Sequence, residues 1–248
     1  MKDDELNGIS IENFNEFTYS KRKHFDNLFF KKNYGIKLYN KLIDINNCRL
    51  KVYQDLLILS FIIENIPKKS KILEIGGGDS RIINHLKNEY QCYNIDKLEG
   101  LGNGPEKIDT NGFLLVPDYM GNFNAQLANN SFDFVFSISA LEHVPIGDVK
   151  IFENIYHDIQ RVLKPGGFSL HAFDVVIKKT TVWSNPFLFY LFDNSNPINS
   201  FIPFDEMIKD DDLFMMSESF YKESWQLITK KSYCDFGKPL SYNILWQK

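Results

Sequence analysis

The fold of this chain is decided by one stretch, KILEIGGGDS, at residues 71–80. An apolar strand carrying Glu74 runs into three consecutive glycines, and a helix follows them. Because glycine lacks a Cβ, the backbone can turn sharply here and approach a bound ligand more closely than any other residue permits. Asp79 or Ser80 can then cap the helix, which we expect over residues 81–88. The stretch therefore predicts a strand, a ligand-binding loop and a helix, in that order.

The spacing of the glycines separates two kinds of ligand. Dinucleotide loops follow the pattern G-x-G-x-x-G and place a pyrophosphate at the N-terminus of the helix. Here the glycines are contiguous, and Asp79 sets a negative charge where a pyrophosphate would bind. The loop therefore favours a cationic ligand, and the alternative is a tight turn in some other α/β protein.

Three segments downstream continue the pattern of strands that end in polar residues. Residues 92–96 (CYNID) end in an acid about 20 residues after the loop, the separation at which a neighbouring parallel strand brings a carboxylate to ribose hydroxyls. Residues 131–144 (SFDFVFSISALEHV) predict a buried strand that runs into a loop. Residues 163–168 (LKPGGF) predict the end of a helix before a further strand.

Taken in this order, the segments resemble the class I S-adenosylmethionine-dependent methyltransferases of the small-molecule type, whose motifs read E-x-G-x-G, D, L-E-H-V and L-K-P-G-G. The resemblance covers residues 70–174. It implies S-adenosyl-L-methionine as the cofactor and a Rossmann-like α/β fold, with a mostly parallel seven-stranded sheet flanked by helices. It also implies the residues that bind the cofactor, namely Glu74, Gly76, Gly77, Gly78, Asp96, Asn122 and Ser139.

Two features depart from the family pattern. The third motif glycine is Ser80 in this chain. The position that often carries an adenine-binding aspartate falls on Gly121-Asn122, where the amide of Asn122 can still pair with adenine. Residues 97–105 replace the expected helix with a turn-rich loop, which we expect to cover the cofactor.

The whole chain is interpreted as a single methyltransferase domain over residues 1–248. We expect strands at residues 71–75, 92–96, 132–137 and 168–173, an amphipathic helix at 49–65, and closing strands at 224–229 and 242–246. An aromatic-rich insertion precedes the closing strands; it either shapes the acceptor pocket or forms an irregular core patch. The expected parts are an N-terminal helical cover (1–66), a cofactor-binding core (70–174), the acceptor-side insertion (178–222) and the closing strands (223–248).

Composition limits the classes of partner that this protein is expected to bind. The net charge of -4 and a pI near 5.8 disfavour nucleic acid, because a phosphate backbone requires a basic surface. The three cysteines form no C-x-x-C pair, so we expect no metal site, no disulfide and a reducing, cytoplasmic location. The longest aliphatic run, residues 56–63, is too short to span a membrane. Small-molecule acceptors remain, and the oligomeric state stays open.

Two histidines lie where strand ends should face an acceptor. His143 follows the fourth strand, and His171 lies within the fifth. A histidine with a pKa near neutrality can take a proton from a hydroxyl or an amine during methyl transfer. For each there is a structural alternative: His143 orders its loop, or His171 points into the sheet packing.

The acceptor is inferred by analogy. The Asn, Lys, Ile and Phe bias suggests an AT-rich bacterial genome, and short methyltransferases of this kind often act on surface polysaccharides. We expect O-methylation of a sugar, a sugar-linked phosphate or a related precursor in capsule or polysaccharide biosynthesis. The alternatives are a catalytically silent S-adenosylmethionine-binding protein and N-methylation of a small amine. Asp79 opposes a nicotinamide-dependent oxidoreductase.

Overall fold

The computed structural model describes residues 8–25, 33–100 and 104–248, and the chain divides into two compact units. The sheet unit comprises residues 66–173, 185–199 and 244–248. The helical unit comprises residues 1–65, 174–184 and 200–243. Two long strands, β5 (Leu163–Ile177) and β7 (Lys238–Gln247), contribute residues to both units.

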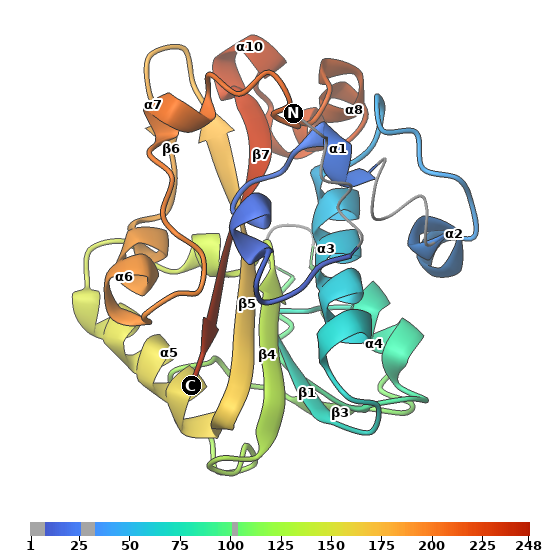
Figure 1. Cartoon of the computed structure of the whole chain (residues 1–248), viewed down its shortest axis with the longest axis vertical. Helices are drawn as coiled ribbons and strands as arrows, with labels where there is room; N and C mark the ends of the chain where they lie inside the picture. The colour runs from blue at the N-terminus through green and yellow to red at the C-terminus, as the bar shows by residue number, and fades with distance from the viewer. Residues whose placement is uncertain (1–7, 26–32, 101–103) are drawn as a thin grey trace. The chain divides into compact units, whose positions relative to one another are not determined.

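The sheet unit contains the elements expected around the glycine loop, and Figure 1 shows its strands β1, β4 and β5 side by side. In chain order its elements are β1 (Lys71–Ile75), α4 (Arg81–Leu86), β2 (Gln91–Ile95), β3 (Leu114–Val116), β4 (Phe132–Ile138), η4 (Leu141–His143), α5 (Val149–Val162) and α6 (Pro186–Asn194).

Among the described residues the sheet has seven strands in the order β3-β2-β1-β4-β5-β6, and β7 also pairs with β5. The pairs from β3 to β5 are all parallel, whereas β6 (Val182–Trp183) is antiparallel to β5. The predicted mostly parallel, Rossmann-like sheet is confirmed. Because β1, β2, β3 and β4 point the same way, the loops that follow them gather at one edge, where ligands bind in such sheets.

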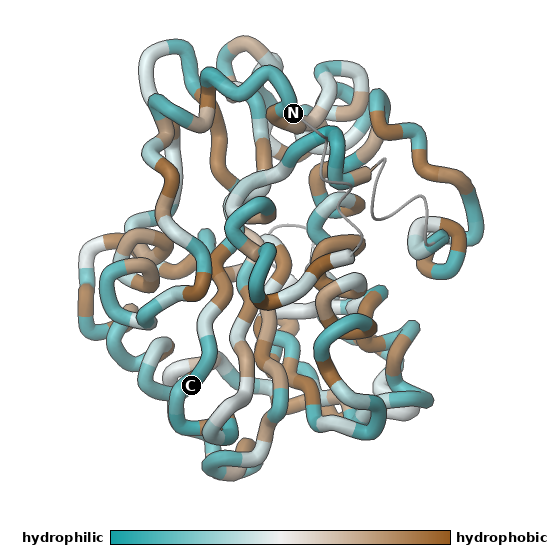
Figure 2. The backbone as a smooth tube through the Cα atoms, viewed as in Figure 1, coloured by the Kyte–Doolittle hydropathy of each residue, from teal (hydrophilic) through white to brown (hydrophobic). Residues whose placement is uncertain are grey.

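The strands form where the sequence has short, nearly continuous apolar runs. Ile72 and Leu73 of β1 and Phe134 and Phe136 of β4 are fully buried, as expected for parallel strands covered on both faces. Figure 2 shows hydrophobic residues concentrated along these strands, with hydrophilic residues in the connecting loops. Burial of these side chains is the main free-energy term that holds the sheet together.

Three helices of the sheet unit start at side-chain caps, and Asn185 caps α6 by accepting a 2.9 Å hydrogen bond from the Phe187 N–H. The Ser80 hydroxyl accepts a hydrogen bond from the Ile83 backbone N–H at 3.0 Å and starts α4. The Asp148 carboxylate accepts one from Lys150 at 2.9 Å and starts α5. The predicted helix stop is also observed, since α5 ends at Val162.

The helical unit is built around α3 (Leu50–Asn65), which is buried even at polar positions. Gln54 donates a 2.8 Å hydrogen bond to the carboxylate of Asp174, and Asp55 accepts one from Tyr39. The other helices of this unit that fall within the described residues are η1 (Phe14–Phe17), α1 (Arg22–His24), α2 (Tyr34–Tyr39), α7 (Phe204–Met207), α8 (Glu218–Glu223), α9 (Trp225–Thr229) and α10 (Tyr233–Phe236).

Two strand predictions need correction. Residues 224–229, expected as a closing strand, form α9 instead. Strand preference depends on pairing with a neighbouring strand, so the β-forming side chains of this segment do not decide its structure. Here the Leu227 side chain is 63% exposed, and the centroids of the Trp225 and Phe236 rings lie 5.7 Å apart. The short strand β3 was not predicted. The other closing strand, residues 242–246, lies within β7.

Within the described residues, no helix combines the length and the apolar character needed to cross a bilayer.

Candidate functional site

The glycine loop after β1 has a backbone that only glycine accommodates. Gly76 has φ +66°, and a Cβ at this position would lie 2.7 Å from the Cβ of Ala140. A Cβ on Gly77 would lie 2.7 Å from the carboxylate carbon of Glu74, a separation that real Cβ atoms do not show. The loop therefore passes directly over the buried Glu74 side chain and against the residue that follows β4.

The end of β2 holds this loop through two side chains. The Asn94 amide accepts a hydrogen bond from Gly77 N–H at 3.2 Å and donates one to the Gly78 carbonyl at 3.0 Å. Asp96 accepts the Gly78 N–H on Oδ2 at 2.8 Å and the Leu98 N–H on Oδ1 at 2.7 Å. A carboxylate oxygen accepts about two hydrogen bonds, so each oxygen of the half-buried Asp96 retains room for a ligand hydroxyl.

Asn94 was missed from the sequence, although it precedes Asp96 by one strand period. Its side chain is fully buried, and Asn94 lies opposite Glu74 in the register of the β1–β2 pair. The signal was a polar residue inside an otherwise apolar strand, since a buried amide has to find hydrogen-bond partners.

The end of β3 supplies a further acid, Asp118, which sequence reasoning also missed. Its carboxylate accepts hydrogen bonds from the side chains of Asn124 and Asn122, at 2.8 Å and 2.6 Å, and from the Tyr119 N–H at 2.8 Å. These bonds, that of Asn124 first, lower the pKa of Asp118. The predicted site residue Asn122 is exposed and donates its amide to Asp118. The signal was Val-Pro-Asp at residues 116–118, an apolar run that ends in an acid as β2 does.

The loop after β4 carries two predicted residues, Ser139 and His143, on either side of Ala140, the residue that meets the glycine loop. Ser139 adopts φ +48°, which turns the chain away from β4, and its N–H donates to the Ala172 carbonyl at 3.0 Å. His143 follows on η4 with an exposed side chain. The buried Asn185 fixes this loop, because its amide donates to the carbonyls of Glu142 and Val144, at 2.8 Å and 2.9 Å, on either side of His143.

His171 lies in the interior of β5, away from the strand ends. Its imidazole is fully buried, and its Nδ1 and Nε2 lie 2.8 Å from the hydroxyls of Ser137 and Ser169. The ring also packs on Trp246 at 4.9 Å. Burial lowers the pKa of His171 from 6.5 to about 3. This placement favours the packing alternative for His171 and leaves His143 as the histidine that faces solvent at a strand end.

Two other expectations concern this region. No group of His, Cys, Asp and Glu side chains suited to a metal ion occurs in the part of the chain that the structure describes. Residues 97–100 and 104–105 of the turn-rich loop are irregular, whereas residues 101–103 lie outside the described part. Pro105 approaches the glycine loop, since a Cβ on Gly78 would lie 3.0 Å from its Cδ.

Residues 73–170 match the family model described as "Methyltransferase domain". This segment is a methyltransferase domain. It spans most of β1, the glycine loop, the ends of β2, β3 and β4, and α5, so the glycine loop, Asp96, Asp118 and His143 lie inside it and Asn185 lies outside. The methyltransferase domain implies S-adenosylmethionine as the cofactor.

Individual proteins are similar to parts of the chain. A sterol 24-C-methyltransferase of Neurospora crassa is 32% identical over 114 residues, which span 41% of this chain and 27% of that protein. A putative sarcosine dimethylglycine methyltransferase from Galdieria sulphuraria superposes with a TM-score of 0.49 at 15% identity, covering 88% of this chain and 96% of that one. The N-methyltransferase NodS from Bradyrhizobium japonicum, in complex with S-adenosylhomocysteine, gives 0.49 at 11% identity, covering 88% and 97%.

Proposed function

We propose that this chain transfers a methyl group from S-adenosylmethionine to a small polar acceptor. The observation that carries the proposal is the row of carboxylates that β1, β2 and β3 bring to one edge of the sheet, from Glu74, Asp96 and Asp118. Glu74 underlies the glycine loop, Asp96 retains room for ribose hydroxyls, and Asp118 suits the amino group of adenine.

The residues fit a cationic ligand better than a pyrophosphate. Carboxylates near the loop attract the ammonium and sulfonium cations of S-adenosylmethionine and repel phosphate, and Asp79 adds a further negative charge at the start of α4. Bound there, S-adenosylmethionine supplies an electrophilic methyl group on a sulfonium that carries its own leaving group. The main tasks of the protein are then positioning and proton removal.

His143 is the proposed base. Its exposed imidazole follows β4 on a loop that Ser139 turns and Asn185 holds, three residues after Ala140, which meets the glycine loop. When a hydroxyl acceptor attacks the methyl group, a nitrogen of His143 would accept the hydroxyl proton, and the carbon–sulfur bond that breaks would leave neutral S-adenosylhomocysteine. His171 is not needed for this step.

For the acceptor we propose a sugar, a sugar-linked phosphate or a related precursor of a bacterial surface polysaccharide, methylated on oxygen in the cytoplasm. The net charge of -4 supports a small acceptor over a nucleic acid. N-methylation of a small amine is the second candidate; it requires the same base only while the amine is protonated.

Calorimetry and thermal unfolding with S-adenosylhomocysteine test the cofactor assignment. Ligand present at a hundredfold excess over Kd should raise the free energy of unfolding by about 2.7 kcal/mol, and NAD and NADP should not change it. The absence of any shift with millimolar S-adenosylhomocysteine would reject the proposal.

Turnover then separates an enzyme from a silent cofactor-binding protein. S-adenosylhomocysteine release is measured with panels of sugar, sugar-phosphate and amine acceptors. Release with hydroxyl acceptors supports O-methylation, and release with amines alone would replace it by N-methylation. Cofactor binding without turnover on any panel would favour the silent alternative.

A further inference from the structure

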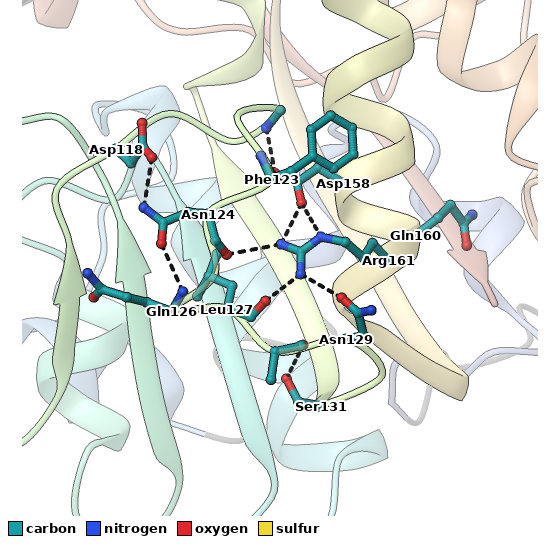
Figure 3. A network of polar contacts seen from close by, with 12 residues as sticks. Asp118, Phe123, Asn124, Gln126, Leu127, Asn129, Ser131, Asp158, Gln160 and Arg161 are labelled. Atoms are coloured by element: carbon teal, nitrogen blue, oxygen red, sulfur yellow. Dashed lines mark hydrogen bonds and ion pairs between the residues drawn. The ribbon is translucent and has the colours of Figure 1, made fainter.

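A buried ion pair on α5 holds the loop that follows β3. Asp158 is fully buried, and its Oδ1 accepts hydrogen bonds from Arg161 Nε at 2.9 Å and Nη2 at 2.8 Å. Its Oδ2 accepts the backbone N–H groups of Gly121 at 2.8 Å and Phe123 at 3.0 Å. One carboxylate therefore fixes both the arginine and the first half of the loop, as Figure 3 shows for Phe123 and Arg161.

Arg161 uses its remaining donors on the second half of the same loop. Nη1 donates to the Leu127 carbonyl and to the Asn129 side chain, the latter at 2.8 Å, and Nη2 donates to the Asn124 carbonyl at 3.3 Å. Figure 3 shows the guanidinium at the centre of these contacts. A planar fork of five donors is needed for this pattern, and lysine does not provide one.

The loop that Arg161 holds also contacts the carboxylate of Asp118 at the end of β3. Asn124, whose carbonyl Arg161 holds, donates its side-chain amide to Asp118 Oδ2 at 2.8 Å (Figure 3). Asp118 Oδ1 accepts two further donors, from Tyr119 and Asn122. A carboxylate offers about four acceptor positions, so among the described residues the position left over is on Oδ2, the oxygen that Asn124 orients.

We propose that the Asp158–Arg161 pair is a positioning unit that makes the cofactor site selective for a purine amino group, acting through Asn124 on Oδ2 of Asp118. This inference rests on the proposed function, because it assumes that an adenosine cofactor binds beside Asp118. Adenine presents an amino donor to that oxygen. Hypoxanthine presents a carbonyl acceptor instead, and an acceptor facing a carboxylate is repelled.

The test compares the Kd values of S-adenosylhomocysteine and S-inosylhomocysteine by calorimetry on the full chain; the two ligands differ at the purine 6-position and in the hydrogen on the adjacent N1. The unmodified protein should prefer the adenosine ligand by about tenfold or more, as expected for a hydrogen bond to a charged group. Arg161→Lys keeps a cation beside Asp158 but loses the fork, so the preference should shrink to within about threefold. Asn124→Ala leaves Arg161 in place and should give the same result, because it removes the hydrogen bond from the half-exposed Asn124 to Asp118, together with the local bond from Gln126 N–H to Asn124.

Lys164→Met is the matched control. It breaks another ion pair of the same unit, between Lys164 and Asp133 at 2.6 Å, and should leave the preference unchanged. A purely structural role for Arg161 would weaken both ligands equally, so an unchanged ratio in Arg161→Lys and Asn124→Ala would overturn the inference alone. Failure of the unmodified protein to bind S-adenosylhomocysteine would overturn the proposed function and the inference together.

Discussion

The strand ends and the strand interiors of the sheet unit carry similar polar residues with opposite environments. At the ends, Asp96 and Asp118 are half-buried and His143 is exposed. In the interior, His171 is fully buried between the hydroxyls of Ser137 and Ser169. Polar groups at the ends retain hydrogen-bonding capacity for a ligand, whereas those inside use theirs on one another. Position along the strand therefore separates polar residues that are available to a ligand from polar residues that are committed to packing.

The largest effect is expected at the end of β4. His143→Ala should lower kcat by about 10²–10⁴-fold while the Kd for S-adenosylhomocysteine stays unchanged, because a general base acts on the acceptor. Activity should recover partly at higher pH, where the acceptor ionises unaided. Steady-state kinetics measure this against His157→Ala, which removes an exposed histidine on α5. Equal kcat values in the two variants would mean that transfer depends on positioning alone.

At the end of β1, Gly76→Ala should weaken S-adenosylhomocysteine binding by about a hundredfold, from left-handed strain and the clash with Ala140 together. Gly166→Ala is the control, because Gly166 also has a positive φ, +80°, but its nearest neighbour atom lies 3.9 Å from the added Cβ. Comparable Kd values for the two variants would show that the close approach is irrelevant to binding.

In the strand interior, a stability effect that depends on pH is expected at His171. Its pKa is about 3 in the fold and near 6.5 when unfolded, so below pH 6.5 only the unfolded chain binds the proton. The free energy of unfolding should then fall with decreasing pH, by about 2 kcal/mol at pH 5. His171→Gln removes this component while its amide can still contact both serines.

Chemical denaturation at pH 7.5, 6 and 5 measures the difference between the two proteins. His24, whose pKa is also lowered by burial, is common to both and cancels. If the free energies of unfolding of the two proteins change in parallel with pH, the pKa of His171 does not differ between the folded and the unfolded chain. A large loss of kcat in His171→Gln at neutral pH, with the fold intact, would contradict the assignment of strand-interior polar residues to stability alone.

The smallest effect is expected at the end of β2. Asp96→Ala should raise the Kd for S-adenosylhomocysteine by about tenfold or more, through loss of charge-assisted bonds to the ligand and of the bond to Gly78. Calorimetry compares it with Asp109→Ala, an exposed carboxylate of the same unit. Unchanged affinity in Asp96→Ala would remove this residue from the site.

Much of the sheet was predictable because its strands are short apolar runs that are separated by glycine, proline and polar residues. β1, β2 and β4 follow the expected ranges within a residue or two. β3 escaped because its described run of Leu114–Val116 is too short to show a period. The segment 224–229 has strand-forming residues, but strand formation needs a partner that only the tertiary structure provides.

Some residues of the candidate site were predictable from the sequence, and others were not. Residues that contact the glycine loop are fixed by local spacing along a strand, as for Glu74 and Asp96. Asn94 also contacts this loop, and its only local signal is that a polar residue stands inside an apolar strand. Asp158 instead binds the backbone of Gly121, 37 residues away, through a hydrogen bond that no local pattern encodes. The two histidines differ in exposure although both lie on or just after a strand, and only the register of β5 against β4 reveals it.

The hydrogen bonds from Asn94 and Asp96 to Gly77 and Gly78 have a consequence for the thermodynamics of ligand association. A loop of three glycines has the greatest conformational freedom to lose when it becomes ordered. Here that entropy is lost when the chain folds, since β2 holds the loop on both its N–H and carbonyl groups. Ligand binding therefore meets a preorganised loop and keeps more of its interaction energy as affinity.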